Sequence, residues 1–544
     1  MGVRGSATFS CPLHAAVPIH TGVNRRQFLF GAAAFAAAAV AGVAIGLDET
    51  RGSGSAHAHG RAKSTATAPP TAAAPVVPPD ALHAEWVARE NAKPGTGDWR
   101  ITSAGEAGAI EGYASAVSAR HGETVNLHVS TRAQSFHVEA YRMGWYGGKG
   151  SRLIWRSEDI RGSRQAPPTV TPRVNLVEAH WDPSLSVPID DTWPQGCYLL
   201  KLVAPAEGVQ QWVPLTVRDD ASRSAFFMMN AITVWQAYNE WGGYSLYFGR
   251  GSGGRTFANR GRIVSFDRPY DQLGGAGDFV GLEFPLVQLL ERQAYDVSYM
   301  TSVDFHRRPD LVLQHRALLS PGHDEYWSKP MRDGAEAARD HGVNLAFFGA
   351  NAAYRQIRFE PSALGTDRHQ VCYKSANEDP MRNVDPSVVT VNWRDPPVNR
   401  PENAMIGQQY ECNPVKADLV IADPGAWVFE GTGVTAGQRI VDGVGPEYDR
   451  YMAGPMAPRN VQILAHSPVN CHGKASFSDM TYYTAPSGAG VFASGSIWWI
   501  TKSTPPGPGS PFNPIANAVT ENVLRVFGAG PAGATHPSQP KPRG

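Results

Sequence analysis

The sequence predicts a multidomain β plus α/β protein, with an N-terminal immunoglobulin-like β-sandwich followed by a doubly wound α/β domain that carries a loop-rich insertion. Between about residues 82 and 220, segments alternate apolar and polar side chains with the period of 2 that half-buried strands show. Across residues 221–530, short apolar runs alternate with helical patterns, which is typical of parallel strands joined by helices. The chain after residue 81 also exceeds the ~100–200 residues of a usual domain, so at least two domains are expected.

The N-terminus has the pattern of a twin-arginine export signal. Arg25 and Arg26 directly precede an alanine-rich apolar run from Gly31 to Leu47, which is the order of a charged region and an apolar region in such signals. A retained membrane anchor is the alternative, but the run is short for the ~30 Å hydrocarbon core of a bilayer. We therefore expect a signal over residues 1–47, no stable membrane insertion after its cleavage, and an extracellular, periplasmic or cell-envelope location.

Two segments have too few large apolar residues to fold on their own. Residues 48–81 consist mainly of Ala, Pro, Thr, Ser and Gly, so burial cannot offset the entropy that ordering costs. They are predicted to form a disordered linker, and residues 531–544 a disordered tail.

The predicted sandwich, residues 82–220, rests on three alternating segments, 123–129, 136–141 and 211–217, with Gly, Pro, Asp and Ser between them. Within it, Tyr141 to Gly150 places aromatic residues among glycines that permit a close backbone approach. This motif predicts either a ligand contact or a tight turn packed against the second domain, and we favour the turn.

The second domain has the pattern of a glutamine-amidotransferase-like or flavodoxin-like sheet. Helical patterns cover residues 282–292 and 329–341, and a final strand and helix are expected near 490–494 and 514–527. Residues 372–461 are rich in Pro, Asn and Asp and are predicted to be an insertion. The predicted buried strands are the apolar runs 225–229, 296–300, 311–313, 317–319 and 343–348.

Charge and cysteine content exclude some classes of function. Lys+Arg and Asp+Glu balance at 49 each without a basic block, so no nucleic-acid partner is expected. Cys372, Cys412 and Cys471 share the second domain, and with Cys197 they make an even number, so a disulfide among the three is expected in an oxidising compartment. No CxxC spacing indicates zinc, and the oligomeric state stays open, a homo-oligomer included.

Candidate functional residues follow two predicted strands. Ligands bind outside the carboxyl ends of the strands in open α/β sheets, and His323-Asp324-Glu325 and Asn351 come just after such ends. Residues i and i+2 of an extended segment share a face, so His323 and Glu325 can converge, near Asn351 on the neighbouring strand. The alternatives are a solvated loop, or Asp324 as the cap of a helix starting near Ser328.

The chain lacks the motifs of covalent and nucleotide-dependent catalysis. It has no Gly-x-Ser-x-Gly elbow, no GxGxxG and no phosphate loop, since the glycine-rich run 249–254 has neither the lysine nor the following helix. Hydrolysis would then use an activated water, and a metal ion held by oxygen ligands is the simplest way to obtain one at neutral pH.

Five motifs together resemble the large (beta) subunit of N,N-dimethylformamidase, and the resemblance runs from about residue 82 to 527. Their order along the chain makes the resemblance more specific than any one motif. The five motifs are 141–150, 237–239, 265–270, 322–327 and 349–351.

The resemblance implies a hydrolase of an amide or related C–N bond that uses a mononuclear iron, with two tyrosines and one glutamate as ligands. Carried over by motif and order, Tyr238 and Tyr270 are the tyrosine ligands and Glu325 is the carboxylate. Hard oxygen ligands suit a ferric ion, whose charge stabilises phenolates despite the tyrosine pKa of about 10. Chain order alone leaves Tyr247 or Tyr326 open as a replacement for one of the two tyrosines.

The resemblance also implies the residues around the iron. Glu447 or His323 would move the proton, and Asn351 would donate a hydrogen bond to the developing oxyanion. Phe492 would form a wall of the substrate pocket. These roles predict a small amide-like substrate.

The chain departs from that family by its export signal and by having no segment like the family's small partner subunit, which leaves the substrate open. One alternative is a secreted, non-catalytic protein that binds glycans or cell-envelope polymers and has a silent α/β domain. Another is a hydrolase of sugar or ester bonds that uses His323, Asp324 and Glu325 without iron.

Overall fold

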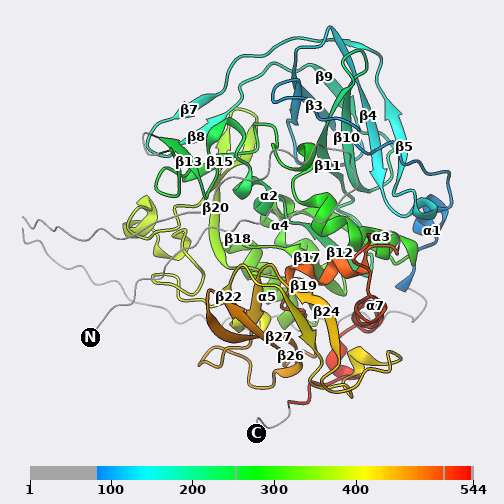
Figure 1. Cartoon of the computed structure of the whole chain (residues 1–544), viewed down its shortest axis with the longest axis vertical. Helices are drawn as coiled ribbons and strands as arrows, with labels where there is room; N and C mark the ends of the chain where they lie inside the picture. The colour runs from blue at the N-terminus through cyan, green and yellow to red at the C-terminus, as the bar shows by residue number, and fades with distance from the viewer. Residues whose placement is uncertain (1–81, 252–253, 507–508, 541–544) are drawn as a thin grey trace, which may run out of the picture. The chain divides into compact units, whose positions relative to one another are not determined.

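The computed structural model describes residues 82–251, 254–506 and 509–540, which form a mixed α and β structure with several sheets (Figure 1). The predicted signal, residues 1–47, and the predicted linker, residues 48–81, lie outside the described residues. Within the described part of the chain, no helix is long and apolar enough to cross a membrane.

The N-terminal region contains two sheets of mainly antiparallel strands, with one core between them. Val125, Leu127 and Val129 of the first sheet and Leu200 and Leu202 of the second are buried in this core. The first sheet has the order β1 (Ile110–Ala114), β3 (Thr124–Thr131), β9 (Leu185–Pro188). The second has the order β2 (Ser118–Ala119), β11 (Val209–Val217), β10 (Gly196–Ala204), β4 (Ser135–Met143), β5 (Ser151–Arg156), with β6 (Ile160–Arg161) beside β4. Two packed sheets are thus present, while the immunoglobulin-like identity stays a prediction.

The larger of these sheets is buried on both faces at β10, where every position is buried. Leu200 and Leu202 of β10 face the β-region core, whereas Cys197 and Leu199 join a second core that also contains Phe226. The core therefore continues across the domain boundary predicted at residue 220, and the described residues belong to one compact unit.

A seven-stranded sheet follows, in which six strands run in one direction and β27 (Lys474–Thr484) runs antiparallel between its two neighbours. Alternate residues of its strands enter different cores, Phe226 and Met228 on one face and Phe227 and Met229 on the other. Its order is β16 (Val297–Thr301), β12 (Phe226–Asn230), β17 (Ala317–His323), β19 (Asn344–Ala350), β28 (Gly490–Ala493), β27 (Lys474–Thr484), β26 (Gln462–Cys471). The next strand of this sheet after β12 in the chain, β16, lies on one side of it, and the following ones, β17 and β19, lie on the other side. The flavodoxin-like and glutamine-amidotransferase-like assignments stay predictions.

Side-chain caps mark the start of α4, α5 and α7 among the described α-helices. Ser328 accepts a bond from the Met331 amide at the start of α5, so Ser328 and not Asp324 is the cap of this helix. Asn513 accepts from the amides of Ile515 and Ala516 at the start of α7. The helices are α1 (Glu85–Asn91), α2 (Ile232–Tyr238), α3 (Phe284–Arg292), α4 (Ser302–Arg307), α5 (Lys329–Asp340), α6 (Asn403–Ile406) and α7 (Pro514–Ala529).

Two predicted segments differ from the structure. Residues 311–313, predicted as a strand, lie in the 3-10 helix η6 (Pro309–Gln314), because Pro309 presets a helical φ and the run is too short to show a period. Residues 531–540, predicted as part of a disordered tail, are ordered: Ala532 is buried and the Ser538 hydroxyl accepts from the Thr484 amide at 3.2 Å. Hydrogen bonds to a strand, rather than apolar composition, hold this segment.

The predicted insertion, residues 372–461, contains only short elements, as its composition indicated. Two two-stranded sheets lie in it: β22 (Gln409–Cys412) with β25 (Tyr448–Arg450), and β23 (Ala417–Val420) with β24 (Arg439–Val444). The expected disulfide joins Cys412 and Cys471, while Cys197 and Cys372 are free and buried.

The remaining strands form small sheets beside the site. A four-stranded sheet has the order β15 (Ile263–Ser265), β21 (Gly365–Val371), β20 (Arg355–Ser362), β18 (Tyr326–Ser328). The other pairs are β7 (Thr169–Thr171) with β8 (Leu176–Glu178), and β13 (Gly249–Gly251) with β14 (Gly254–Thr256).

The glycine-flanked motif at residues 141–150 contributes to packing. Both terminal nitrogens of Arg142 donate to the Glu291 carboxylate of α3, at 2.7 and 2.6 Å, and both side chains are fully buried. Gly147 has a φ of 64°, in the left-handed region that glycine tolerates. The tight turn against the following region is therefore what the structure shows.

Candidate metal centre

The candidate site lies at the carboxyl ends of three strands of the seven-stranded sheet. β12 leads into α2, whose last residue is Tyr238. β17 ends at His323, which Glu325 follows, and β19 ends one residue before Asn351. β17 and β19 approach closely at Gly349, where an added Cβ would lie 1.7 Å from the carbonyl oxygen of Gly322.

Oxygen atoms of two tyrosines and one glutamate converge at this edge. The Tyr247 hydroxyl lies 2.7 Å from each carboxylate oxygen of Glu325. The Tyr238 hydroxyl lies 3.0 Å from Glu325 Oε2 and 3.0 Å from the Tyr247 hydroxyl, and the two rings stack at 4.4 Å between centroids. This tyrosine pair and the carboxylate form the oxygen cluster.

Tyr270, predicted as the second tyrosine, is not in the oxygen cluster. Its ring packs edge to face against Trp235 at 6.3 Å, and its carbonyl oxygen accepts from the Gln211 amide at 3.2 Å. Among the hydrogen bonds between described residues, none joins Tyr270 to Tyr238 or Glu325. The structure brings Tyr247, which the sequence left open as a replacement, to Tyr238 and Glu325 instead. The metal role of either tyrosine stays a prediction.

The position of Tyr247 beside Tyr238 has a local cause. After α2 the chain turns back through Gly242, whose φ is 76°, and the Ser245 hydroxyl accepts from the Tyr247 amide at 3.2 Å. This return places Tyr247 beside Tyr238, nine positions away in the chain. In the sequence, the only indication of this pair is that two tyrosines lie nine positions apart after a strand end.

His323 lies beside the cluster, as predicted, within ion-pair distance of two carboxylates. Its Nε2 is 3.7 Å from Glu325 Oε2 and 3.8 Å from Glu447 Oε2, and its ring centroid is 5.6 Å from that of Tyr238. Neither ring nitrogen has a hydrogen-bond partner among the described residues, although the side chain is fully buried. Buried polar atoms are ordinarily satisfied, so this position fits a bound ion, water or substrate.

Asn351 and Glu447 also meet, as predicted. Asn351 Nδ2 donates to Glu447 Oε2 at 2.6 Å, and the Asn351 amide donates to Asp449 Oδ1 at 2.8 Å. Asn351 has a φ of 55°, a left-handed conformation that Asn tolerates better than most residues. Glu447 and Asp449, two residues apart, thus hold the side chain and the backbone of one residue.

Phe492 lies on β28 and packs in the core. Its side chain is fully buried, and its ring packs on that of Phe348 at 5.8 Å. Its role as a wall of the substrate pocket stays a prediction.

Two basic side chains beside the cluster were not predicted from the sequence. Arg355 Nε lies 3.4 Å from Glu325 Oε1, and Lys374 Nζ lies 3.2 Å from the centroid of the Tyr247 ring and donates to the Tyr326 hydroxyl at 2.7 Å. Arg355 is the first residue of β20, four positions after Asn351, and Lys374 follows the end of β21 by three positions. No local motif indicated Lys374.

The surroundings shift the pKa values of Glu325 and Tyr247 in opposite directions. Burial acts to raise the pKa of Glu325, but Lys374, His323 and Arg355 outweigh it, so this pKa is lowered and the carboxylate is ionised. Burial, and next the Glu325 charge, raise the pKa of Tyr247 well above its ordinary value. A phenolate at Tyr247 therefore needs a strong additional positive charge.

The oxygen cluster fits a small, hard metal ion. Neighbouring ligands of an octahedral ion bound at about 2.0–2.1 Å lie about 2.9 Å apart, and the cluster oxygens are separated by 2.7 to 3.0 Å. Phenolate and carboxylate oxygens suit ferric iron, whose charge would offset the raised phenol pKa. Tyr238, Tyr247 and Glu325 are thus the residues that would hold it.

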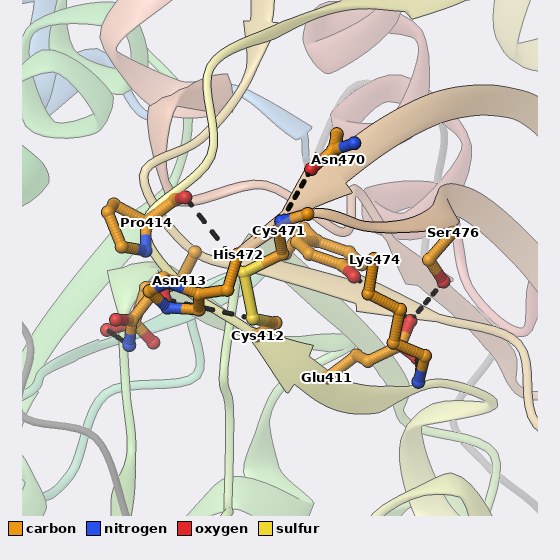
Figure 2. Close-up of a disulfide and its surroundings, with 12 residues drawn as sticks. Glu411, Cys412, Asn413, Pro414, Asn470, Cys471, His472, Lys474 and Ser476 are labelled. Atoms are coloured by element: carbon orange, nitrogen blue, oxygen red, sulfur yellow. Dashed lines mark hydrogen bonds and ion pairs between the residues drawn. A yellow bond between two sulfur atoms is a disulfide. The ribbon is translucent and has the colours of Figure 1, made fainter. Parts of the chain in front are cut away.

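A second group of metal-ligand types does not form such a site. Cys412, Cys471 and His472 lie close together, but the two cysteines form a disulfide and offer no thiolate. Figure 2 shows this disulfide with its neighbours.

Comparison with known families places the oxygen cluster inside a family match. A family model described as N,N-dimethylformamidase beta subunit-like, C-terminal, matches residues 137–504, which is more than half of the chain and includes every residue of the cluster. No curated protein matches the chain.

Proposed function

The chain belongs to the N,N-dimethylformamidase beta subunit-like family, and on that premise we propose that it is an amidohydrolase that cleaves a small amide or related C–N bond with a mononuclear ferric ion. The observation that carries the proposal is the buried convergence of the Tyr238, Tyr247 and Glu325 oxygens within 3.0 Å of one another. A domain without catalytic function has no need of three hard ligands placed this way.

The chain's own residues then divide the chemistry. Bound iron supplies Lewis-acid polarisation of the amide carbonyl or of a water molecule. Glu447 accepts the proton of the attacking water and returns it to the leaving nitrogen. His323 lies within 3.8 Å of both Glu325 and Glu447, close enough to assist that transfer.

Asn351 has the donor that the developing oxyanion needs. Its amide nitrogen carries two protons, and one is donated to Glu447 at 2.6 Å. The second can be donated to the carbonyl oxygen as negative charge develops there. Burial of His323, Asn351 and Glu447 strengthens these interactions by excluding water.

The test is the iron content and visible spectrum of the purified chain. Wild type should contain about one iron per chain and absorb visible light, because phenolate ligands transfer charge to ferric ions. Tyr247→Phe, Tyr238→Phe and Glu325→Gln should lose most iron and the absorption band while remaining folded.

Tyr270→Phe is the matched control, because it removes the same hydroxyl outside the oxygen cluster, and it should keep both iron and colour. Equal iron in wild type and Tyr247→Phe would refute the ligand set. A colourless, iron-free wild type from iron-replete cells would favour the secreted glycan-binding or envelope-binding alternative.

We also propose that the chain is exported by the twin-arginine route and acts outside the cytoplasm. The Arg25-Arg26 pair before the apolar run supports export, and so does the Cys412–Cys471 disulfide, because such bonds persist in oxidising compartments. Replacing both arginines with lysine should leave the chain in the cytoplasm, as cell fractionation would show. Unchanged export of that variant would refute the route.

A further inference from the structure

The carboxylate of Glu447 is held from two sides by asparagine amides. Asn351 Nδ2 donates to Oε2 at 2.6 Å, and Asn413 Nδ2 lies 3.3 Å from Oε1 as its donor. Glu447 is 1% exposed and Asn413 is 6% exposed, so both contacts lie away from bulk water. Hydrogen bonds to a carboxylate stabilise its charged form, which is the form a general base needs.

Asn413 lies in a different segment of the chain from the proposed catalytic residues. It directly follows Cys412 at the end of β22, and its Nδ2 also donates to the Tyr410 hydroxyl at 2.7 Å. Its carbonyl oxygen lies 2.7 Å from His472 Nε2, in the turn after β26. Figure 2 shows Asn413 beside the disulfide, with His472 between the two chain segments.

The disulfide connects this segment to the seven-stranded sheet. Among the described strands, β22 pairs only with β25, the short strand that follows Glu447, whereas β26 belongs to the large sheet. The Cys412–Cys471 bond links β22 to β26 across 59 positions of the chain. It therefore fixes the residue next to Asn413 to a strand of the seven-stranded sheet.

We propose that Asn413 is a positioning residue for Glu447 and that the Cys412–Cys471 disulfide holds it in that role, so that the enzyme is fully active only with the disulfide formed. The inference rests on the proposed function, in which Glu447 moves protons. It predicts that a chain in a reducing compartment folds but works poorly, and that export completes the site.

Two variants and one reagent separate the parts of this proposal. Asn413→Ala removes the amide donor and keeps the disulfide, whereas the double variant Cys412→Ser, Cys471→Ser removes the bond and keeps Asn413. Dithiothreitol reduces the wild-type disulfide to two thiols while it is itself oxidised to a cyclic disulfide. Asn470→Ala is the control, because Asn470 accepts from the Gly473 amide in the same hairpin but makes no described contact with Asn413.

The activity readout is hydrolysis of N,N-dimethylformamide as the probe. Asn413→Ala, the double serine variant and the reduced wild type should each lose about tenfold in kcat, the scale of one hydrogen bond to a charged group. Their KM should stay within twofold, with iron content and thermal midpoint of Asn413→Ala unchanged. Asn470→Ala should match wild type, and a wild-type kcat for Asn413→Ala would overturn the positioning role.

The structural readout is amide hydrogen exchange at residues 409–415 and 445–450. The double serine variant and the reduced wild type should exchange faster there than oxidised wild type and Asn470→Ala. Unchanged exchange in both would overturn the role of the disulfide. If oxidised, iron-loaded wild type cleaves no amide, the proposed function fails, and exchange alone then decides whether the disulfide holds Asn413 at Glu447.

Discussion

Replacing Glu283 with glutamine should abolish a pH dependence of stability. The Glu283 carboxylate is 1% exposed and accepts from Asn230 Nδ2 at 2.7 Å, the Ala231 amide at 3.0 Å and Trp235 Nε1 at 2.8 Å. Burial raises its pKa to about 8 although these three bonds act to lower it. At neutral pH Glu283 is therefore protonated in the folded chain. In that form it holds the start of α2, the helix that ends at Tyr238.

The sign follows from proton linkage. Below the ordinary pKa of 4.5, Glu283 is protonated in both the folded and the unfolded chain, and its contribution to stability is fully present. Between pH 4.5 and about 8, the unfolded chain releases a proton that the folded chain retains, so stability falls as pH rises. Above the folded pKa the contribution is lost and no longer changes.

The magnitude follows from the same values. A difference of about 3.5 pKa units at 1.36 kcal/mol per unit is at most about 5 kcal/mol. For about 460 ordered residues the unfolding entropy is about 1 kcal/mol/K, so the effect on Tm is at most about 5 °C. Glutamine has a similar shape, has no charge to titrate, and can still accept from Ala231 and Trp235.

Scanning calorimetry at pH 5, 6, 7 and 8 on the oxidised protein measures this effect. The Tm of wild type should fall relative to that of Glu283→Gln by several degrees across the series. Glu85→Gln, a change at a side chain that is 78% exposed, is the control and should give a constant difference. A constant difference between wild type and Glu283→Gln would refute the reasoning.

Three further outcomes are expected. Glu291→Gln leaves the buried Arg142 guanidinium without its counter-charge, which should cost about 3–5 kcal/mol and lower Tm by about 3–5 °C in calorimetry; an unchanged Tm would contradict this. Gly349→Ala places a methyl group 1.7 Å from the Gly322 carbonyl oxygen, so little folded protein should appear in gel filtration, and a normal yield would show that the strands can separate. Asn351→Ala removes the oxyanion donor and should lower kcat about 10²-fold with iron retained; full activity would remove Asn351 from the mechanism.

Local sequence patterns were sufficient to predict the strands that carry the site. The apolar runs at residues 225–229, 317–319 and 343–348 are β12, the start of β17 and β19. Because neighbouring parallel strands end at the same edge of a sheet, the closeness of His323 and Asn351 followed from their positions alone. The meeting of Asn351 with Glu447, 96 positions apart, could be expected only from the family resemblance.

Residues placed by long-range folding could not be predicted in the same way. The choice between Tyr247 and Tyr270 depends on how the chain returns after α2, which no periodicity encodes. Lys374 reaches the Tyr247 ring from a hairpin that follows the site by about 50 positions, and its approach depends on packing of the whole four-stranded sheet. Cysteine count allowed a disulfide, but its pairing depends on how the fold brings the end of β22 to the end of β26.

The most direct test of the amidohydrolase account is amine release from small amides by the iron-loaded, oxidised chain. N,N-dimethylformamide, N-methylformamide, formamide and acetamide would be incubated with wild type and with Glu447→Gln, and the amine or ammonia released would be quantified by chromatography. The account predicts release in proportion to bound iron, and at least a hundredfold loss in Glu447→Gln with its iron retained. A wild-type chain that holds one iron and releases nothing from any of the four amides would contradict it.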